Sequence, residues 1–209
     1  MKTSEEATQS EIDSLLRRGL IVEYASLGWM TVEAVGAIAA GVFSGSVALL
    51  AFGGDSFIEL LSSYAVADFL RRSVKGGTGE RERVERITAF LLLILIPVIG
   101  LGALYSYLSG IEAEASPIGI AVASGAVLIM PLLWYEKKRI GIATNCLPLT
   151  IDAVESSTCL LMSIALLGSL IVNYLWKIWW VDYVATVVIL AFVAREGLEA
   201  ISEMREPHL

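Results

Sequence analysis

Six long apolar stretches divide the sequence, at residues 20–42, 46–70, 87–109, 117–135, 143–172 and 179–195. Each is close to the ~20 residues that an α-helix needs to cross the hydrocarbon core of a bilayer. The composition agrees, because 18% of the residues are charged, whereas a soluble domain usually has about 25%. In a bilayer every backbone polar group must be paired within the chain, which favours helices. The sequence therefore predicts an all-α membrane protein, a bundle of six transmembrane helices.

The positive charges predict how this bundle is oriented. With a cytoplasmic N-terminus, all Lys and Arg residues except Lys177 fall on the inner side or at the inner helix ends. Such a bias places the positive side in the cytoplasm, and it requires an even number of crossings. We therefore expect cytoplasmic N- and C-termini in a multi-pass protein of the cell (inner) membrane.

The segments outside the apolar stretches are short. We expect residues 1–19 to form a cytoplasmic N-terminal segment, either an amphipathic helix or disordered, residues 20–195 to form the transmembrane domain, and residues 196–209 to form a cytoplasmic tail. The polar, acidic start does not predict a signal peptide. Cys146 and Cys159 both lie in the fifth stretch and indicate no disulfide framework. We expect no nucleic-acid partner, because the chain has no basic tract.

Carboxylates inside the apolar stretches point to function. Asp55 and Glu59 lie four residues apart in the second stretch, on one face of a helix, and Asp152 and Glu155 lie in the fifth. An ionised side chain at the bilayer centre costs at least ~2.5–3.5 kcal/mol and usually faces a polar pathway. Because no Lys or Arg is expected within the helix centres, we expect these acids to be protonated, hydrogen-bonded or bound to a cation. Asp182, at the start of the sixth stretch, is expected to cap that helix.

The second and fifth stretches share a sequence pattern. Residues 55–63 read DSFIELLSS and residues 155–163 read ESSTCLLMS, both of the form acid-Ser-x-x-ligand-Leu-Leu-x-Ser. If the two helices pack together, they bring three carboxylates and a thiol to one four-coordinate cation site. These side chains belong to Asp55, Glu59, Glu155 and Cys159. A competing register of the fifth helix places Asp152 and Ser156 at the ligand positions instead.

The same residues resemble the transmembrane part of the cation diffusion facilitator family. The similar stretches are residues 33–63 for the first two helices, 151–168 for the fifth and 179–201 for the sixth. In this register Asp55 and Glu59 take the family's ligand positions in the second helix, and Glu155 and Cys159 take those in the fifth. The resemblance implies six helices and efflux of a divalent metal in exchange for protons.

The chain departs from typical members of that family. The only histidine, His208, lies in the tail, and the family's His-rich loop is reduced to YEKKRIG at residues 135–141. The C-terminal cytoplasmic domain that binds metal and dimerises in typical members is not expected here, so the chain resembles a subgroup that lacks it. A homodimer would then form through the transmembrane helices.

Neighbouring carboxylates in a low dielectric cannot all ionise cheaply, so we expect the empty site to hold protons that a divalent metal displaces. Alternating access would make such a site a metal/proton antiporter. We expect Zn²⁺ as the exported ion, with Mn²⁺ or Fe²⁺ next, because a thiol favours zinc and oxygen ligands favour harder ions. We expect no bound cofactor.

Two other classes of function are open to a chain of this kind. One is a non-transporting membrane scaffold or assembly protein whose buried carboxylates only hold helices together. The other is an intramembrane enzyme that uses two acids. The second and fifth stretches lack the Tyr-Asp and Gly-x-Gly-Asp patterns of intramembrane aspartyl proteases. We therefore expect no enzymatic activity, and the scaffold is the alternative that the sequence leaves open.

Overall fold

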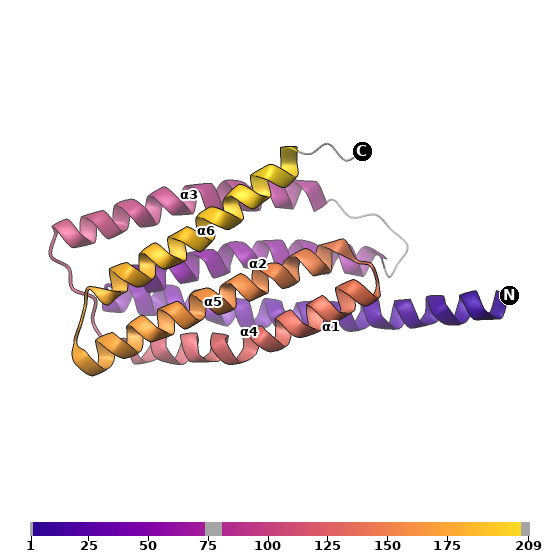
Figure 1. Cartoon of the computed structure of the whole chain (residues 1–209), viewed down its shortest axis with the longest axis horizontal. Coiled ribbons are helices and arrows are strands. Elements are labelled where there is room, and N and C mark those ends of the chain that lie inside the picture. The colour runs from indigo at the N-terminus through magenta and orange to yellow at the C-terminus, as the bar shows by residue number, and fades with distance from the viewer. Residues whose placement is uncertain (1, 74–80, 206–209) are drawn as a thin grey trace.

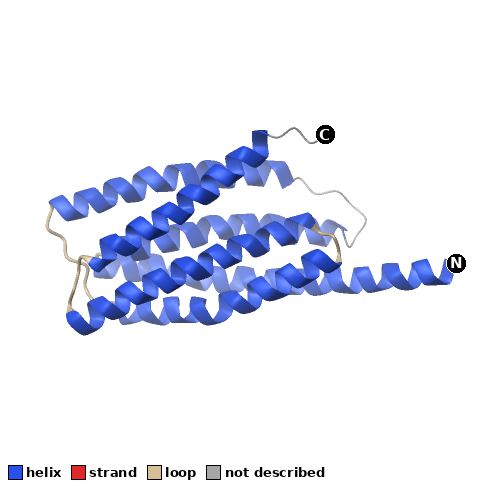
Figure 2. Ribbon diagram, in the orientation of Figure 1, coloured by secondary structure: helices blue, strands red, loops and turns tan. Residues whose placement is uncertain are grey.

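The computed structural model describes the backbone of residues 2–73 and 81–205 and the side chains of residues 12–73 and 90–198. Over the described residues the chain is helical and contains no strand (Figure 2). The helices are α1 (Lys2–Ser44), α2 (Val47–Ser73), α3 (Arg81–Leu108), α4 (Pro117–Ala143), α5 (Leu147–Trp176) and α6 (Val181–Arg205). The prediction of an all-α protein is therefore confirmed.

Within the described part of the chain, five helices, α1 to α5, are long and apolar enough to cross a membrane. The helix α6 is not among these five. Its residues 181–198 contain three charged residues, Asp182, Arg195 and Glu196. It nevertheless runs along the bundle against α5 and α3 (Figure 1). The chain is thus a helical membrane bundle, with one helix for each apolar stretch of the sequence.

The helix ends differ from those that hydropathy predicts. The structure has α1 beginning at Lys2, so that residues 2–19 belong to the first helix, and this part extends beyond the other helices (Figure 1). At the other boundaries, α4 continues past residue 135 to Ala143, and α6 continues past residue 195 to Arg205. These two extensions place Lys137 and Glu196 inside helices.

Four helices form the main bundle. In it α1 contacts α2 and α4, and α5 also contacts α2 and α4. The remaining two, α3 and α6, contact each other and both lie against α2, while α6 also contacts α5 (Figure 1). The start of α1 and the end of α6 lie at the same end of the molecule, as an even number of crossings requires (Figure 1).

The central helix is α2, which contacts four others. In its most apolar window 61% of the residues are buried, against 17–39% in the other four spans. Gly53 makes part of this packing possible, because a Cβ there would lie 2.8 Å from the backbone nitrogen of Ile38 in α1. Glycine therefore lets the backbones of α1 and α2 approach closely. The acids of α2 are in this way surrounded by other helices.

Asp182 ties the start of α6 to the start of α2. Its carboxylate accepts hydrogen bonds from Ser46 Oγ at 2.5 Å, from Val47 N at 2.9 Å and from Ala48 N at 3.2 Å. The first N–H groups of a helix have no partner within that helix. The expectation that Asp182 caps its own helix is therefore wrong, because packing places its carboxylate over the N-terminus of α2.

We predict that Asp182→Ala lowers the melting temperature of the purified protein in detergent. The substitution leaves the buried N–H groups of Val47 and Ala48 without their acceptor, which costs about 1–3 kcal/mol. Thermal unfolding followed by circular dichroism measures the effect. Glu112→Ala, which removes an exposed acid from the loop between α3 and α4, is the matched control. Equal melting temperatures for the two variants would contradict the importance of this cap.

Candidate metal centre

Three carboxylates from α2 and α6 meet inside the bundle. Asp55 and Glu59 lie one turn apart near the middle of α2, and Glu196 lies on α6. One carboxylate oxygen from each residue lies within 4.8 Å of the other two. Asp55 is completely buried and Glu59 is 4% exposed. Among the residues whose side chains the structure describes, no other group of three or more His, Cys, Asp or Glu side chains lies close enough together to share a metal ion.

The carboxylates of Asp55 and Glu59 lack hydrogen-bond donors. All four of their oxygens are buried, and none has a hydrogen-bond partner in the described part of the chain. Leaving a buried polar group unpaired costs about 1–3 kcal/mol, and more if it is charged. Folded proteins rarely leave such groups without a partner. A proton or a cation is therefore the partner that this group requires.

Cys159 lies beside this group but is bonded elsewhere. Its Sγ donates a hydrogen bond to Glu33 Oε1 at 3.3 Å. The Glu33 carboxylate also accepts from Ser56 Oγ at 2.8 Å and from Trp29 Nε1 at 2.6 Å. Glu33 is thus fully supplied with donors, in contrast to the acids of α2. The thiol is within electrostatic reach of Asp55 and Glu59, yet it is not part of the three-carboxylate group.

Glu155 also lies at the edge of the group. It accepts a hydrogen bond from Ser62 Oγ, at 3.1 Å to Oε2 and 3.4 Å to Oε1. Its carboxylate is within electrostatic reach of Glu196 and of Asp152. Glu155 therefore lies between the three-carboxylate group and Asp152.

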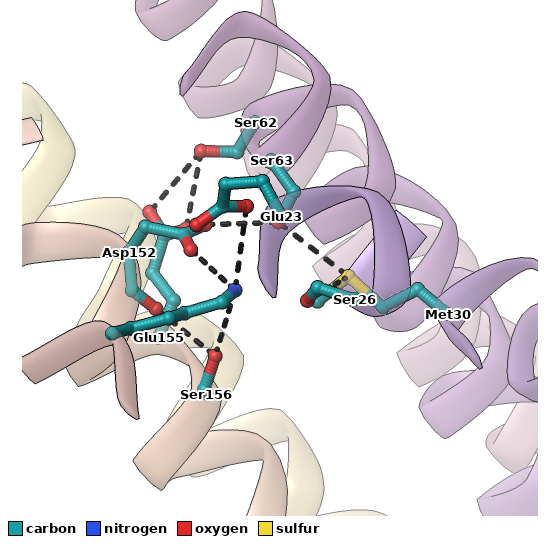
Figure 3. Close-up of polar contacts among 9 residues, drawn as sticks. Glu23, Ser26, Met30, Ser62, Ser63, Asp152, Glu155 and Ser156 are labelled. Carbon is teal, nitrogen blue, oxygen red and sulfur yellow. Dashed lines mark hydrogen bonds and ion pairs between the residues drawn. The ribbon is translucent and has the colours of Figure 1, made fainter. Parts of the chain in front are cut away.

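Asp152 is bonded to a lysine. Its carboxylate forms an ion pair with Lys137 Nζ and accepts a hydrogen bond from Ser63 Oγ at 2.9 Å. Lys137 is completely buried, and its ammonium also lies 3.6 Å from Glu23 Oε2 and donates to Ser156 Oγ at 3.2 Å. Figure 3 shows Glu23, Asp152 and Ser156 around the ammonium nitrogen, which is drawn in blue.

The expectation that no Lys or Arg neutralises these acids is therefore wrong for Asp152. Sequence analysis places Lys137 in a cytoplasmic loop, whereas α4 continues through it to Ala143. The neighbouring Lys138 and Arg139 are exposed. Of these three consecutive basic residues, Lys137 alone faces the interior of the bundle. Pairing with two acids offsets the cost of burying that charge.

The structure thus sorts the candidate ligands of the sequence analysis into three sets. It brings Asp55 and Glu59 together, it leaves Glu155 and Cys159 beside them with other partners, and it pairs Asp152 with Lys137. Neither register of the fifth helix supplies a member of the three-carboxylate group.

Sequence reasoning missed Glu196. One signal was available, because Glu196 follows Asp182 by nearly four helical turns, so that both lie on similar sides of α6. Asp182 contacts the start of α2, and Glu196 meets the middle of α2. A helix assumed to end at residue 195 conceals this relation.

Comparison with known proteins identifies the family. The model of the cation efflux transmembrane domain matches residues 24–205, which include Asp55, Glu59 and Glu196. No curated protein matches the chain. The family match covers almost the whole chain and confirms the resemblance to the cation diffusion facilitators. On this match, and with six helices packed as described, the chain belongs to the cation efflux family.

Proposed function

We propose that this metal cation transporter is a divalent metal/proton antiporter that exports its ion through the centre formed by Asp55, Glu59 and Glu196. Family membership supports metal cation transport. The location of the site is inferred from four buried carboxylate oxygens on α2, for which the described side chains and backbone offer no hydrogen-bond partner. Carboxylate oxygens are common ligands of divalent cations.

The geometry supports exchange of protons for metal. Three carboxylate oxygens within 4.8 Å of one another repel strongly in a low dielectric if all three groups are ionised. Without metal the group would therefore hold protons, and its titration would be shared among the members. Metal ligands must be deprotonated, so metal binding releases those protons. Alternating exposure of such a site to the two sides of the membrane couples metal export to proton entry.

The helices around the site suggest which parts move. Asp182 holds α6 against the start of α2, so these two helices carry Asp55, Glu59 and Glu196 together. The neighbouring α5 carries Glu155 and Cys159. In our proposal a displacement of α5 relative to α1 and α2 breaks the bond of Glu155 to Ser62 and that of Cys159 to Glu33, and adds Glu155 and Cys159 to the metal.

The proposed substrates are Zn²⁺ first, then Mn²⁺ or Fe²⁺. The three carboxylates alone suit oxygen-preferring ions such as Mn²⁺, whereas a thiolate ligand favours Zn²⁺. Selection of zinc therefore requires Cys159, which is completely buried and within electrostatic reach of Asp55 and Glu59.

We predict that metal flux driven by a pH gradient is lost in Asp55→Ala and in Glu155→Ala, because each removes a carboxylate that exchanges protons for metal. The measurement is uptake of Zn²⁺, Mn²⁺ and Fe²⁺ into proteoliposomes, with folding checked by size-exclusion chromatography. Glu112→Ala, at an exposed position, should transport like wild type. Flux that survives both site substitutions, or no flux in wild type, would return these acids to the structural role of a scaffold.

We predict that Glu196→Gln weakens metal binding by at least about tenfold, since even residues that only support metal ligands contribute 10–100-fold to affinity. Glutamine keeps the size of the side chain and removes its charge. Isothermal titration calorimetry on the purified protein measures the affinity, with Glu112→Gln as the matched control. Lowering the pH should also weaken binding to wild type, because protons compete for the carboxylates. Wild-type affinity in Glu196→Gln would exclude α6 from the site.

We predict that Cys159→Ser lowers the affinity for Zn²⁺ by about 10–100-fold and leaves that for Mn²⁺ nearly unchanged. A hydroxyl can replace the thiol as the donor to Glu33, so the packing is retained while the soft ligand is lost. Competition between the two ions in the same calorimeter measures the change in selectivity. An equal effect on both ions would show that Cys159 is not a zinc ligand.

A further inference from the structure

A second buried group of charges lies nearer the end of the bundle where α4 turns into α5. It consists of Glu23 from α1, Lys137 from α4 and Asp152 from α5, which are 0%, 0% and 1% exposed. The turn between α4 and α5 lies at the same end as the start of α1 (Figure 1). None of these three residues belongs to the three-carboxylate group.

The single ammonium does not satisfy both acids. Lys137 Nζ pairs closely with Asp152, but it lies 3.6 Å from Glu23 Oε2. Neither oxygen of Glu23 has a hydrogen-bond partner within the described residues. Two carboxylates facing one ammonium also leave one negative charge without a counter-ion when all three groups are ionised. A divalent cation would balance both acids.

The ammonium occupies a position lined with ligands that hard cations use. Carboxylate oxygens of Glu23 and Asp152 and the hydroxyl of Ser156 surround Nζ (Figure 3). Ser63 Oγ holds Asp152 Oδ1 at 2.9 Å, which orients that carboxylate. Carboxylates and other oxygen donors make up most sites for Mn²⁺, Mg²⁺ and Ca²⁺.

We propose that Glu23 and Asp152 form a second divalent-cation site, which the ammonium of Lys137 occupies in this conformation as a tethered substitute for the ion. A lysine side chain carries a compact charge on a flexible stem, so it can withdraw without displacement of α4. Along α2, Ser62 and Ser63 bond Glu155 and Asp152 and follow Asp55 and Glu59 of the metal centre, so the two sites lie in succession along the bundle. This site exists independently of the proposed transport through the metal centre.

The test counts the Mn²⁺ ions bound per chain by the full-length protein in detergent, using equilibrium dialysis. The parent variant carries Asp55→Asn and Glu59→Gln, which remove the proposed metal centre, and it should bind no ion. Adding Lys137→Met should raise the count to one ion per chain. Adding Lys137→Arg instead, which keeps a cation in place, should leave the count at zero. Combining Lys137→Met with Asp152→Asn should remove the new ion.

Either of two results would overturn the proposal: no added ion with Lys137→Met, or an added ion that persists with Asp152→Asn. Removing one partner of a buried ion pair is destabilising, so thermal unfolding provides a second readout. Mn²⁺ should raise the melting temperature of the Lys137→Met protein and not that of the protein with Asp152→Asn as well. Absence of this stabilisation also rejects the site. An ion already bound by the parent variant would occupy the second site, with Lys137 withdrawn, if Asp152→Asn removes it. If Asp152→Asn leaves it bound, that ion lies outside the second site and the proposal is overturned.

Discussion

The cost of burying carboxylates beyond the reach of water governs the arrangement of this bundle. Among the residues whose burial the structure describes, six acids are at most 4% exposed: Glu23, Glu33, Asp55, Glu59, Asp152 and Asp182. Burying an ionised carboxylate costs several kcal/mol, so each buried acid needs a hydrogen-bond donor, a counter-ion or a proton. The partners that each acid finds therefore separate the acids that hold the fold together from those available for an ion. Asp182 and Glu33 belong to the first kind, since helix N–H groups and side-chain donors satisfy them.

The two buried groups of acids differ in the partners that the structure shows for them. The group of Asp55, Glu59 and Glu196 has three acids, and two of them have no hydrogen-bond donor in the described part of the chain. The group of Glu23 and Asp152 has a cation of its own in Lys137. The carboxylates of Asp55 and Glu59, which find no hydrogen-bond donor among the described residues, therefore depend on a proton or a metal ion as their partner, and metal can bind them only once they are deprotonated.

The position of α2 explains how one helix can serve both packing and the proposed metal centre. It contacts α1, α3, α5 and α6, and the close approach at Gly53 brings the backbone of α1 against it. Asp182 connects its first residues to α6. A change in the position of α5 therefore alters the surroundings of the two α2 acids without separating them from Glu196.

The sequence by itself determined the helical membrane architecture, because apolar length is a local property of the chain. It also determined that Asp55 and Glu59 share one helix face, since their spacing matches one turn. Lys137 and Glu196 escaped prediction because both follow the point where an apolar stretch gives way to charges, whereas the helices continue to Ala143 and Arg205.

Only the tertiary structure decided which acid meets which partner. The resemblance between residues 55–63 and 155–163 predicts convergence of α2 and α5, yet Glu196 of α6 joins Asp55 and Glu59, and Asp152 joins Lys137. These partnerships depend on the depth and rotation at which whole helices pack. Depth and rotation result from the contacts of many side chains at once, so no spacing within a single helix encodes them.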